Sequence, residues 1–333
     1  MKYYVLRLKF LTPVHFGTAE NKKSGNLQSF NCCADTFFSA LATEAAALDT
    51  QLCESFIAAA QEGSLLFSDL LPYYSGAEDE LYVPVPCYRR EYANTLNFNL
   101  SFKDLCLQYE ARREHENLAY IRAGAVKAFI QPLTDGNVLE QEKHRFGWSG
   151  VQRRMDFRNG GSAYYVSNYS FAGGAGLYCI VGLKDDSLLE PLLKTVELLG
   201  LGGIGGRRSS GFGKFVLRDK PLELAENCGG DAGVLYKLLN SENAGVQMTL
   251  SVLCPVTGQI DAVKEGSFVL LQRSGFAYNH EAGCYEKRSN VYMIKAGACF
   301  GKRVDGQVLE LAAQGAGHAV YRYGKAMYMG LPV

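Results

Sequence analysis

The chain has 333 residues, of which 47% are hydrophobic and 20% are charged, and its 34 basic residues equal its 34 acidic residues in number. This composition is typical of a globular protein with a sizeable core, and the length suits two ordinary domains or one large one. Zero net charge argues against a protein that binds nucleic acid over its whole surface, although it is compatible with a local basic groove.

Cysteine usage and hydropathy indicate the compartment. The ten cysteines are scattered and include no C-x-x-C pair, so the sequence predicts neither a zinc site nor a redox motif, and no cofactor. The start, MKYYVLRLKF, is not a signal peptide, and no apolar run approaches ~18 residues. We expect a cytoplasmic protein with reduced, mostly buried thiols and no contact with a membrane.

The N-terminal elements follow from local patterns. Residues 2–11 alternate in polarity and predict a strand that ends at Thr12-Pro13. Asp35-Thr36 offers an N-cap for an alanine- and leucine-rich helix over 37–48, and a second helix follows over roughly 51–60. From about 65 to 171 no long helical period exists, which predicts hairpins and loops with a short helix around 102–116.

The next elements define the fold class. The sequence predicts a buried strand over 176–183, an amphipathic helix over 186–200 and a strand over 212–219. The chain begins with a strand and a helix, and later has a strand, a helix, a loop and a strand. This order is typical of an α+β, ferredoxin-like βαββαβ unit with a large insertion. We therefore predict an N-terminal domain over 1–225, with the insertion at about 65–171. A boundary at 220–245 would precede a second strand-rich domain over 246–333.

The glycine-rich loop at 200–213 lies within LGLGGIGGRRSSGFGKF, residues 199–215. Its early glycines satisfy G-x-G-x-x-G, but a dinucleotide site needs a strand before the glycines and a helix after them, and here the order is reversed. A Walker loop also fails, because Phe215 follows Lys214 where serine or threonine is required. A nucleotide-dependent enzyme is therefore disfavoured.

What remains is a loop suited to an RNA backbone. Glycines let the backbone approach a ligand, two adjacent guanidiniums match phosphate, and serine hydroxyls add hydrogen bonds. The alternative is a plain connector with two solvated arginines. We favour phosphate binding, by Gly202, Gly203, Gly205, Gly206, Arg207, Arg208, Ser209, Ser210, Gly211, Phe212 and Gly213.

A second basic segment, KHRFGWSGVQRRMDFRNGG, occupies residues 143–161. Its cations match phosphates and its aromatic rings can stack on bases, so it predicts a hairpin that contacts RNA or a partner, rather than a solvated loop. We assign RNA contacts to Arg153, Arg154 and Arg158, and partner or hairpin (thumb) contacts to Trp148 and Phe157.

Three further positions have competing interpretations. His15, with Phe16 and Gly17, follows the first strand and is a candidate RNA contact; a role as general acid or base is the alternative. Arg322 alternates with Tyr321 and Tyr323, which would leave it on one strand face for RNA or a partner. Cys32-Cys33 point different ways along an extended chain and are expected to be buried thiols rather than metal ligands.

At this point the residues resemble a known family. GIGGRRSSGFGKF (203–215) is similar to the glycine-rich loop G-x-G-x-R-x-S-x-G-F-G of the RAMP superfamily of CRISPR-associated proteins. LTPVHFGT (11–18), ADTFFSALATE (34–44) and the closing VYRYGKAMYMGLPV (320–333) resemble one RAMP family, the type III-A (Csm) effector subunit that caps the 5′ end of the guide RNA. The matches span the whole chain. One departure is Cys33-Ala34, where the family often has serine before the aspartate.

The resemblance implies two packed ferredoxin-like, RRM-related domains and a non-catalytic subunit. The glycine-rich loop would bind the 5′ handle of the guide RNA (crRNA), and a thumb hairpin would lie beside the first guide–target pairs. Expected partners are the large polymerase/cyclase-like subunit and a neighbouring backbone RAMP subunit, in antiviral defence. Two alternatives stay open: a RAMP endoribonuclease that processes the guide with His15, and the equivalent capping subunit of a type III-B complex.

Overall fold

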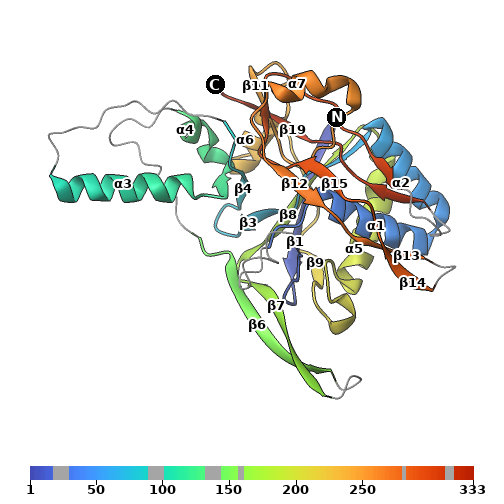
Figure 1. Cartoon of the computed structure of the whole chain (residues 1–333). Helices are drawn as coiled ribbons and strands as arrows, with labels where there is room; N and C mark the ends of the chain where they lie inside the picture. The colour runs from blue at the N-terminus through green and yellow to red at the C-terminus, as the bar shows by residue number, and fades with distance from the viewer. Residues whose placement is uncertain (18–29, 89–100, 132–143, 157–160, 280–282, 312–318) are drawn as a thin grey trace.

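The computed structural model describes residues 1–17, 30–88, 101–131, 144–156, 161–279, 283–311 and 319–333 (Figure 1). Its main element is an antiparallel sheet with the strand order β10-β1-β8-β3-β4-β5, in which β2 also pairs with β8 and β9 with β1. The strands are β1 (Lys2–Phe10), β2 (Leu65–Phe67), β3 (Leu71–Tyr74), β4 (Glu80–Pro84), β5 (Tyr120–Arg122), β8 (Ala175–Leu183), β9 (Phe215–Leu217) and β10 (Leu222–Glu223). The predicted strands at 2–11, 176–183 and 212–219 are therefore confirmed, the last of them as a shorter element.

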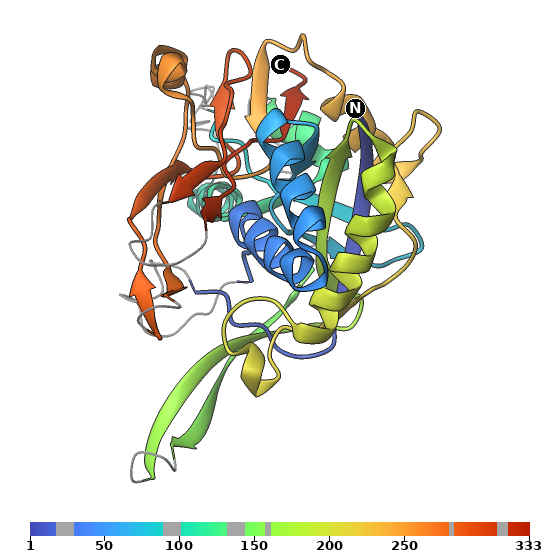
Figure 2. The ribbon, with the colours of Figure 1, turned by 90° about the vertical axis from the view of Figure 1, so that its right-hand side faces the viewer.

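Three helices cover one face of this sheet (Figure 2). They are α1 (Ala34–Leu48), α2 (Thr50–Glu62) and α5 (Leu189–Gly202), which confirm the predicted helices. The alternation in β1 works as expected on this face, because Tyr4, Leu6 and Leu8 join the core beneath the helices. β8, at the centre of the sheet, is buried along its whole length.

The other sheet face carries a second core cluster. Tyr3 and Val5 of β1 pack there with the helix α6 (Gly230–Leu239) and with strands of the C-terminal part. The segment expected as a boundary, 220–245, thus contains β10, which pairs with β1, and α6, which contributes Leu235 and Leu239 to this core. Hydrophobic burial therefore continues from the first predicted domain into the second.

The C-terminal part consists mostly of short strands. A three-stranded sheet has the order β16-β11-β19, and the remaining strands form the antiparallel pairs β12–β15, β13–β14 and β17–β18. The elements are β11 (Val246–Thr249), α7 (Ile260–Lys264), β12 (Leu270–Arg273), β13 (Phe276–Asn279), β14 (Cys284–Lys287), β15 (Val291–Ile294), β16 (Cys299–Phe300), β17 (Leu309–Leu311), β18 (Val320–Arg322) and β19 (Tyr328–Leu331). The expected strand-rich composition is confirmed.

The segment predicted as an insertion, 65–171, contributes β2, β3, β4 and β5 to the main sheet, and two of its other parts project from the body (Figure 1). One carries the helix α3 (Phe102–Glu116), which confirms the short helix predicted there, and the short α4 (Val126–Ile130) lies at its base. The other is a long hairpin of β6 (Gly147–Asp156) and β7 (Ser162–Phe171), paired from Gly147↔Phe171 to Asp156↔Ser162. The predicted hairpin therefore exists, and it extends well beyond the body of the protein (Figure 2).

The start of α1 differs from the prediction. The N-cap position is Cys33, and Asp35 lies inside the helix. The distant Asp69 instead accepts a hydrogen bond from the Ala34 N–H at 2.8 Å, and the same oxygen, Oδ1, accepts one from the Val252 N–H at 3.2 Å. Asp69 thereby takes over the capping role and ties the helix to the C-terminal part.

Asp35 has a different partner set. Its carboxylate is almost fully buried and receives two hydrogen bonds from Arg273, at 2.8 and 2.9 Å, and one from Arg322 at 2.7 Å. The prediction that Arg322 faces RNA or a partner from an exposed strand face is therefore wrong, because its side chain is 5% exposed and ion-paired. One carboxylate on α1 thus fixes β12 and β18 against the first helix.

We expect Asp35→Ala to lower the free energy of unfolding by about 3–5 kcal/mol, because it leaves two largely buried guanidiniums without their carboxylate. Urea denaturation followed by circular dichroism measures this. Asp261→Ala is the matched control, since that side chain is 96% exposed and pairs with Lys264 of its own helix. Equal stability of both variants would contradict the structural role given to Asp35.

Asp69 generates a second prediction, because burial raises the pKa of its carboxyl from 3.8 to about 7. Between these values the folded state keeps a proton that the unfolded state releases, so this group's contribution to stability falls as pH rises from about 4 to about 7. Asp69→Asn stays neutral and retains an acceptor oxygen for both N–H groups. Its unfolding free energy relative to wild type should therefore increase by a few kcal/mol from pH 4 to pH 8.

Urea titrations of wild type and Asp69→Asn at several pH values measure this difference. Asp261→Asn, at an exposed position, should run parallel to wild type throughout. A pH-independent difference between Asp69→Asn and wild type would show that the carboxyl is not protonated in the folded state.

Candidate nucleic-acid interface

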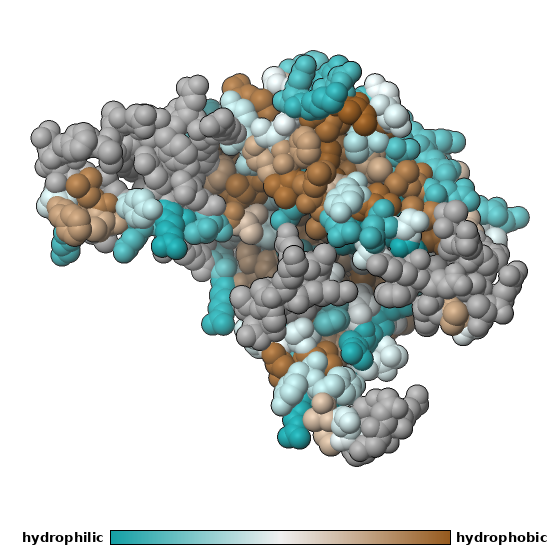
Figure 3. All heavy atoms as spheres, viewed as in Figure 1, coloured by the Kyte–Doolittle hydropathy of each residue, from teal (hydrophilic) through white to brown (hydrophobic). Residues whose placement is uncertain are grey.

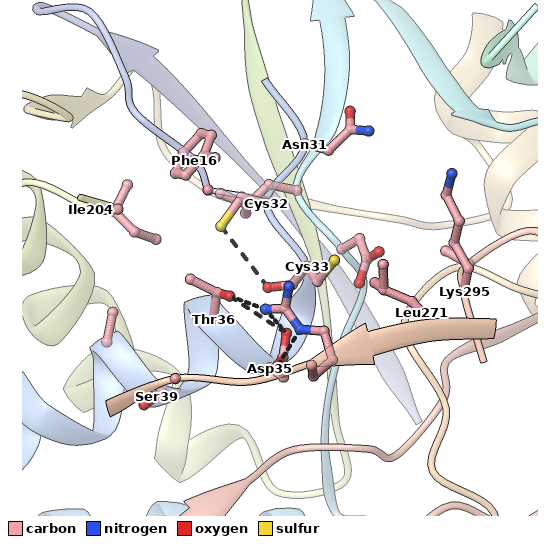
Figure 4. A pocket seen from close by; sticks show the side chains of 18 of the residues that line it. Phe16, Asn31, Cys32, Cys33, Asp35, Thr36, Ser39, Ile204, Leu271 and Lys295 are labelled. Carbon is pink, nitrogen blue, oxygen red and sulfur yellow. Dashed lines mark hydrogen bonds and ion pairs between the residues drawn. The ribbon is translucent and has the colours of Figure 1, made fainter. Parts of the chain in front are cut away.

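A cavity of about 530 Å³ lies between the glycine-rich loop, the start of α1 and the strands of the C-terminal part. Figure 4 shows Phe16 and Ile204 on one side of it, and Leu271 and Lys295 on the other, with Asp35 and Thr36 at the start of α1 between them. The cavity wall therefore combines segments that are more than 200 residues apart in the sequence.

The charges along this wall are mostly positive. Its lining residues include Arg208, Arg273, Arg288, Lys295 and Arg322, against the carboxyl groups of Asp35 and Asp69. Burial lowers the pKa of Arg273, but the charge and hydrogen bonds of Asp35 outweigh that effect and raise it. A cavity with more cations than carboxylates favours an anionic ligand.

Burial disfavours the thiolate form of two cysteines in this wall. Cys32 is buried and Cys33 half-buried, and burial raises the pKa of both well above the ordinary value. A protonated thiol is neither a nucleophile nor a metal ligand, which agrees with the expectation of buried thiols. Among the described residues, no group of three or more histidine, cysteine, aspartate or glutamate side chains could hold a metal ion.

The glycines of the loop serve its own packing, which differs from the predicted role. At Gly213, with φ +75°, a Cβ would lie 2.0 Å from the Ile204 carbonyl oxygen, and at Gly205, with φ +91°, it would lie 2.9 Å from that of His15. Several loop amides are also already used, since those of Gly206 and Gly213 donate to the carbonyls of His15 and Pro13. The glycines thus hold the loop down onto the segment that follows β1.

This tight folding leaves the polar tip of the loop outside. Arg207, Arg208, Ser209 and Ser210 are exposed, and Arg207 adopts the left-handed region with φ 63°. Arg208 pairs with Glu44 of α1 at 3.5 Å, yet its side chain stays 42% exposed. An exposed pair of this kind is weak and does not prevent either guanidinium from binding an anion.

The outer half of the hairpin contacts this loop. Arg154 and Tyr164 are opposite each other on β6 and β7. The Arg154 guanidinium lies 5.0 Å from the ring centre of Phe212, and the Arg207 guanidinium lies 5.5 Å from that of Tyr164. These two reciprocal cation–π contacts join the loop to the hairpin.

His15 connects the same parts. Its Nδ1 lies 2.7 Å from the carbonyl oxygen of Ser167 on β7, and its own carbonyl accepts from Gly206. Because a carbonyl oxygen only accepts hydrogen bonds, Nδ1 carries a proton and Nε2 is a potential acceptor. His15 lines the cavity, as do Gly17, Gly205 and Gly206.

Two predicted aromatic positions are almost fully buried. Phe16 and Phe212 are each 3% exposed. Phe16 lines the cavity, and the Phe212 ring lies under the Arg154 guanidinium. Gly202 lies in the last turn of α5. Arg153 is exposed on the hairpin, as is Trp148 at 50%, whereas Phe157 and Arg158 lie outside the described residues.

Sequence reasoning missed the cations of the C-terminal part. Arg273 ends β12, Arg288 follows β14 and Lys295 follows β15, and all three line the cavity. Nothing in their local sequence distinguishes them from solvated strand-end residues. Only the long-range packing of these strands against α1 brings them beside the glycine-rich loop.

Comparisons with known proteins agree with this picture. Residues 242–331 match the family of the CRISPR Csm4 C-terminal domain. The chain is 26% identical over 335 residues to the CRISPR system protein Csm4 of Streptococcus thermophilus, with 99% of each covered. It is also 26% identical over 324 residues to Csm4 of Mycobacterium tuberculosis, with 96% of this chain and 94% of that protein covered.

The fold is similar to chains in solved complexes. A chain of the Csm3–Csm4 subcomplex of the type III-A CRISPR-Cas interference complex matches with a TM-score of 0.62 at 14% identity, with 100% of both chains covered. A chain of the Csm1–Csm4 cassette in complex with AMPPNP matches with a TM-score of 0.58 at 16% identity, covering 100% of this chain and 99% of that one. No helix among the described residues is long and apolar enough to span a membrane. The chain thus matches the Csm4 C-terminal family over residues 242–331, is similar to Csm4 proteins over nearly its whole length, and shares its fold with chains of type III-A Csm complexes.

Proposed function

We propose that this chain is the non-catalytic, guide-RNA-binding structural subunit of a type III-A CRISPR effector complex, and that it binds the 5′ handle of the guide. The observation that carries the proposal is the exposed Arg207-Arg208-Ser209-Ser210 tip beside a cation-lined cavity. Two adjacent forked donors and two hydroxyls suit successive phosphates of one strand. The similarity to Csm4 proteins over nearly the full length supports this assignment.

The hairpin suits the role of a thumb beside the first guide–target pairs. Val151, Arg153 and Met155 alternate along β6, and Tyr165 pairs with Arg153, so these four share one face. Val151, Met155 and Tyr165 are 56%, 42% and 70% exposed. An apolar face with one guanidinium fits stacking on bases or packing against a neighbouring protein.

Two protein neighbours are part of the proposal. The solved relatives include a Csm3–Csm4 subcomplex and Csm1–Csm4 cassettes. We infer that this chain likewise contacts a backbone RAMP subunit and the large polymerase/cyclase-like subunit. Val269, Leu270 and Tyr292, on or beside β12 and β15, are at least 50% exposed and form a second apolar surface, apart from the hairpin, that suits a protein neighbour. In Figure 3, apolar side chains gather on the upper part of the molecule, where the C-terminal strands lie.

We further propose that the main sheet is a ferredoxin-like RAMP domain. β9, β1, β8 and β3 are neighbours in this order, and α1 and α5 follow β1 and β8 in the chain. That arrangement is the βαββαβ pattern with the hairpin and α3 as insertions. A second ferredoxin-like domain over 246–333 stays a proposal, supported by the strand-rich composition of that part.

Arg207→Ala/Arg208→Ala should weaken binding of an RNA carrying the host's repeat-derived 5′ handle by about 10- to 100-fold. The slope of log K against log salt should also become shallower by roughly 1.4, since each phosphate contact with a single strand contributes about 0.7 to that slope. Fluorescence anisotropy of the purified chain at several salt concentrations, and RNA occupancy of the assembled complex, measure this.

The matched control is Lys237→Ala/Lys302→Ala, which removes two exposed cations that do not line the cavity. This control should bind as wild type does. Unchanged RNA affinity, salt slope and complex occupancy in the arginine variant would refute the assignment of the loop.

The alternative, a guide-processing endoribonuclease, rests on the placement of His15 in the cavity with Nε2 available as a base. No second histidine lies among the described lining residues, and metal-free RNA cleavage needs both an acid and a base. We expect repeat RNA incubated without metal to remain intact with wild type and with His15→Ala alike, as seen on denaturing gels. A cut at one fixed position that disappears in His15→Ala would favour the enzyme.

A further inference from the structure

The cavity contains a buried guanidinium nitrogen that lacks an acceptor. Arg322 Nη1 donates to Asp35, but within the described part of the chain its Nε is buried and has no hydrogen-bond partner. Arg322 lines the cavity and is only 5% exposed. A buried, charged donor without an acceptor is rare in native proteins and points to a ligand group that completes it.

A second guanidinium lies beside it. The backbone N–H of Arg288 donates a hydrogen bond to the backbone carbonyl of Gly275 at 2.8 Å. This bond fixes both residues at the base of the β13–β14 hairpin. A Cβ at Gly275 would lie 3.9 Å from Arg288 Nε and 3.9 Å from Arg322 Nη2, so the two nitrogens are less than 8 Å apart. The absence of a side chain at Gly275 keeps the space between the two guanidiniums open.

The local charge favours an anion in that space. Asp35 is shared between Arg273 and Arg322, and the oxygen of Asp69 that accepts hydrogen bonds is used by two backbone N–H groups. Burial and the positive charge of Arg322 lower the pKa of Arg288. The positive charges of Arg288 and Arg322 repel each other at this separation. An anion that contacts both guanidiniums would stabilise them.

The cavity fits a nucleotide in size and composition. Its volume of about 530 Å³ lies in the range of small-molecule sites, and Tyr321 in the same wall supplies an aromatic ring. Arg208 lines it at the glycine-rich loop, so one wall connects the exposed loop arginines with the buried pair. An RNA strand bound at the loop can therefore extend along cationic side chains to the buried pair.

We propose that Arg288 and Arg322, on either side of Gly275, bind one phosphate group of a nucleotide unit that enters the cavity. Where that unit belongs to the guide strand, the inference rests on the proposed function and adds an internal phosphate contact deeper than the loop. A free mononucleotide would offer the same phosphate, and the test below separates the two sources.

Two substitutions remove the donors while limiting damage to the fold. Arg288→Gln removes one cation. Arg322→Lys keeps a cation for Asp35 but removes Nε and the forked geometry. We expect each to weaken binding of handle RNA by about 3- to 10-fold, and Arg288→Gln to reduce the salt slope by about 0.7.

A third variant tests the space itself. Gly275→Leu would fill the gap between the two guanidiniums without changing charge, whereas Gly275→Ala adds only a Cβ in ordinary contact. We expect Gly275→Leu to weaken RNA binding as Arg288→Gln does, Gly275→Ala to weaken it less, and the exposed Lys302→Gln to bind as wild type. Circular dichroism and urea midpoints identify any variant that fails to fold. The folded variants then decide whether the phosphate site exists.

The same proteins are titrated with adenosine monophosphate and with inorganic phosphate, and thermal stabilisation is measured. RNA affinity lowered in Arg288→Gln and Gly275→Leu identifies a strand phosphate. A mononucleotide shift lost in these variants, with RNA affinity unchanged, identifies a free nucleotide. Variants that match Lys302→Gln in all assays overturn the phosphate site. Wild type that responds to phosphate but does not bind handle RNA overturns the proposed function and leaves the phosphate site intact.

Discussion

The fold depends on one buried carboxylate. Asp35 enters the structure from the first turn of α1 and receives hydrogen bonds from Arg273 on β12 and Arg322 on β18. With Asp69, which bonds the start of the same helix and the Val252 N–H, it fixes the C-terminal strands against the N-terminal sheet layer. A buried charge is stable only when it is paired. The hydrogen bonds of this cluster therefore fix where the C-terminal strands lie in the cavity wall.

The glycine-rich loop and the hairpin form one structural unit. The glycines allow the loop to fold back on His15 and Ile204, and the consequence is that its two arginines and two serines are turned outward. Arg207 and Arg154 then contact rings across the junction with the hairpin. A rigid loop loses little entropy when a strand binds, so in the proposed RNA-binding role the glycines would assist recognition by preorganisation rather than by touching the ligand.

The chain keeps its exposed apolar surface in separate places. One surface lies on the hairpin, at Val151, Met155 and Tyr165, and another on β12 and β15, at Leu270 and Tyr292. Both flank the part of the protein that carries the cationic cavity. A subunit that holds one RNA strand between two protein neighbours would need this distribution, because the apolar patches exclude water where proteins meet and the cations remain for phosphates.

The sequence by itself determined the local elements and the part of the site formed by the glycine-rich loop. Period-two and helical patterns indicated β1, β8, α1 and α5, since these patterns reflect burial within a short segment. The glycines, cations and aromatic residues of 143–161 indicated the hairpin. The density of glycine around Arg207-Arg208 indicated the loop. Only the tertiary structure decided that Asp69 rather than Asp35 serves the start of α1, and that Arg322 is buried. It also decided that Arg273, Arg288 and Lys295 line the same cavity as the loop. That position depends on contacts with α1, such as Arg273 with Asp35, more than 200 residues earlier in the chain, which no local pattern records.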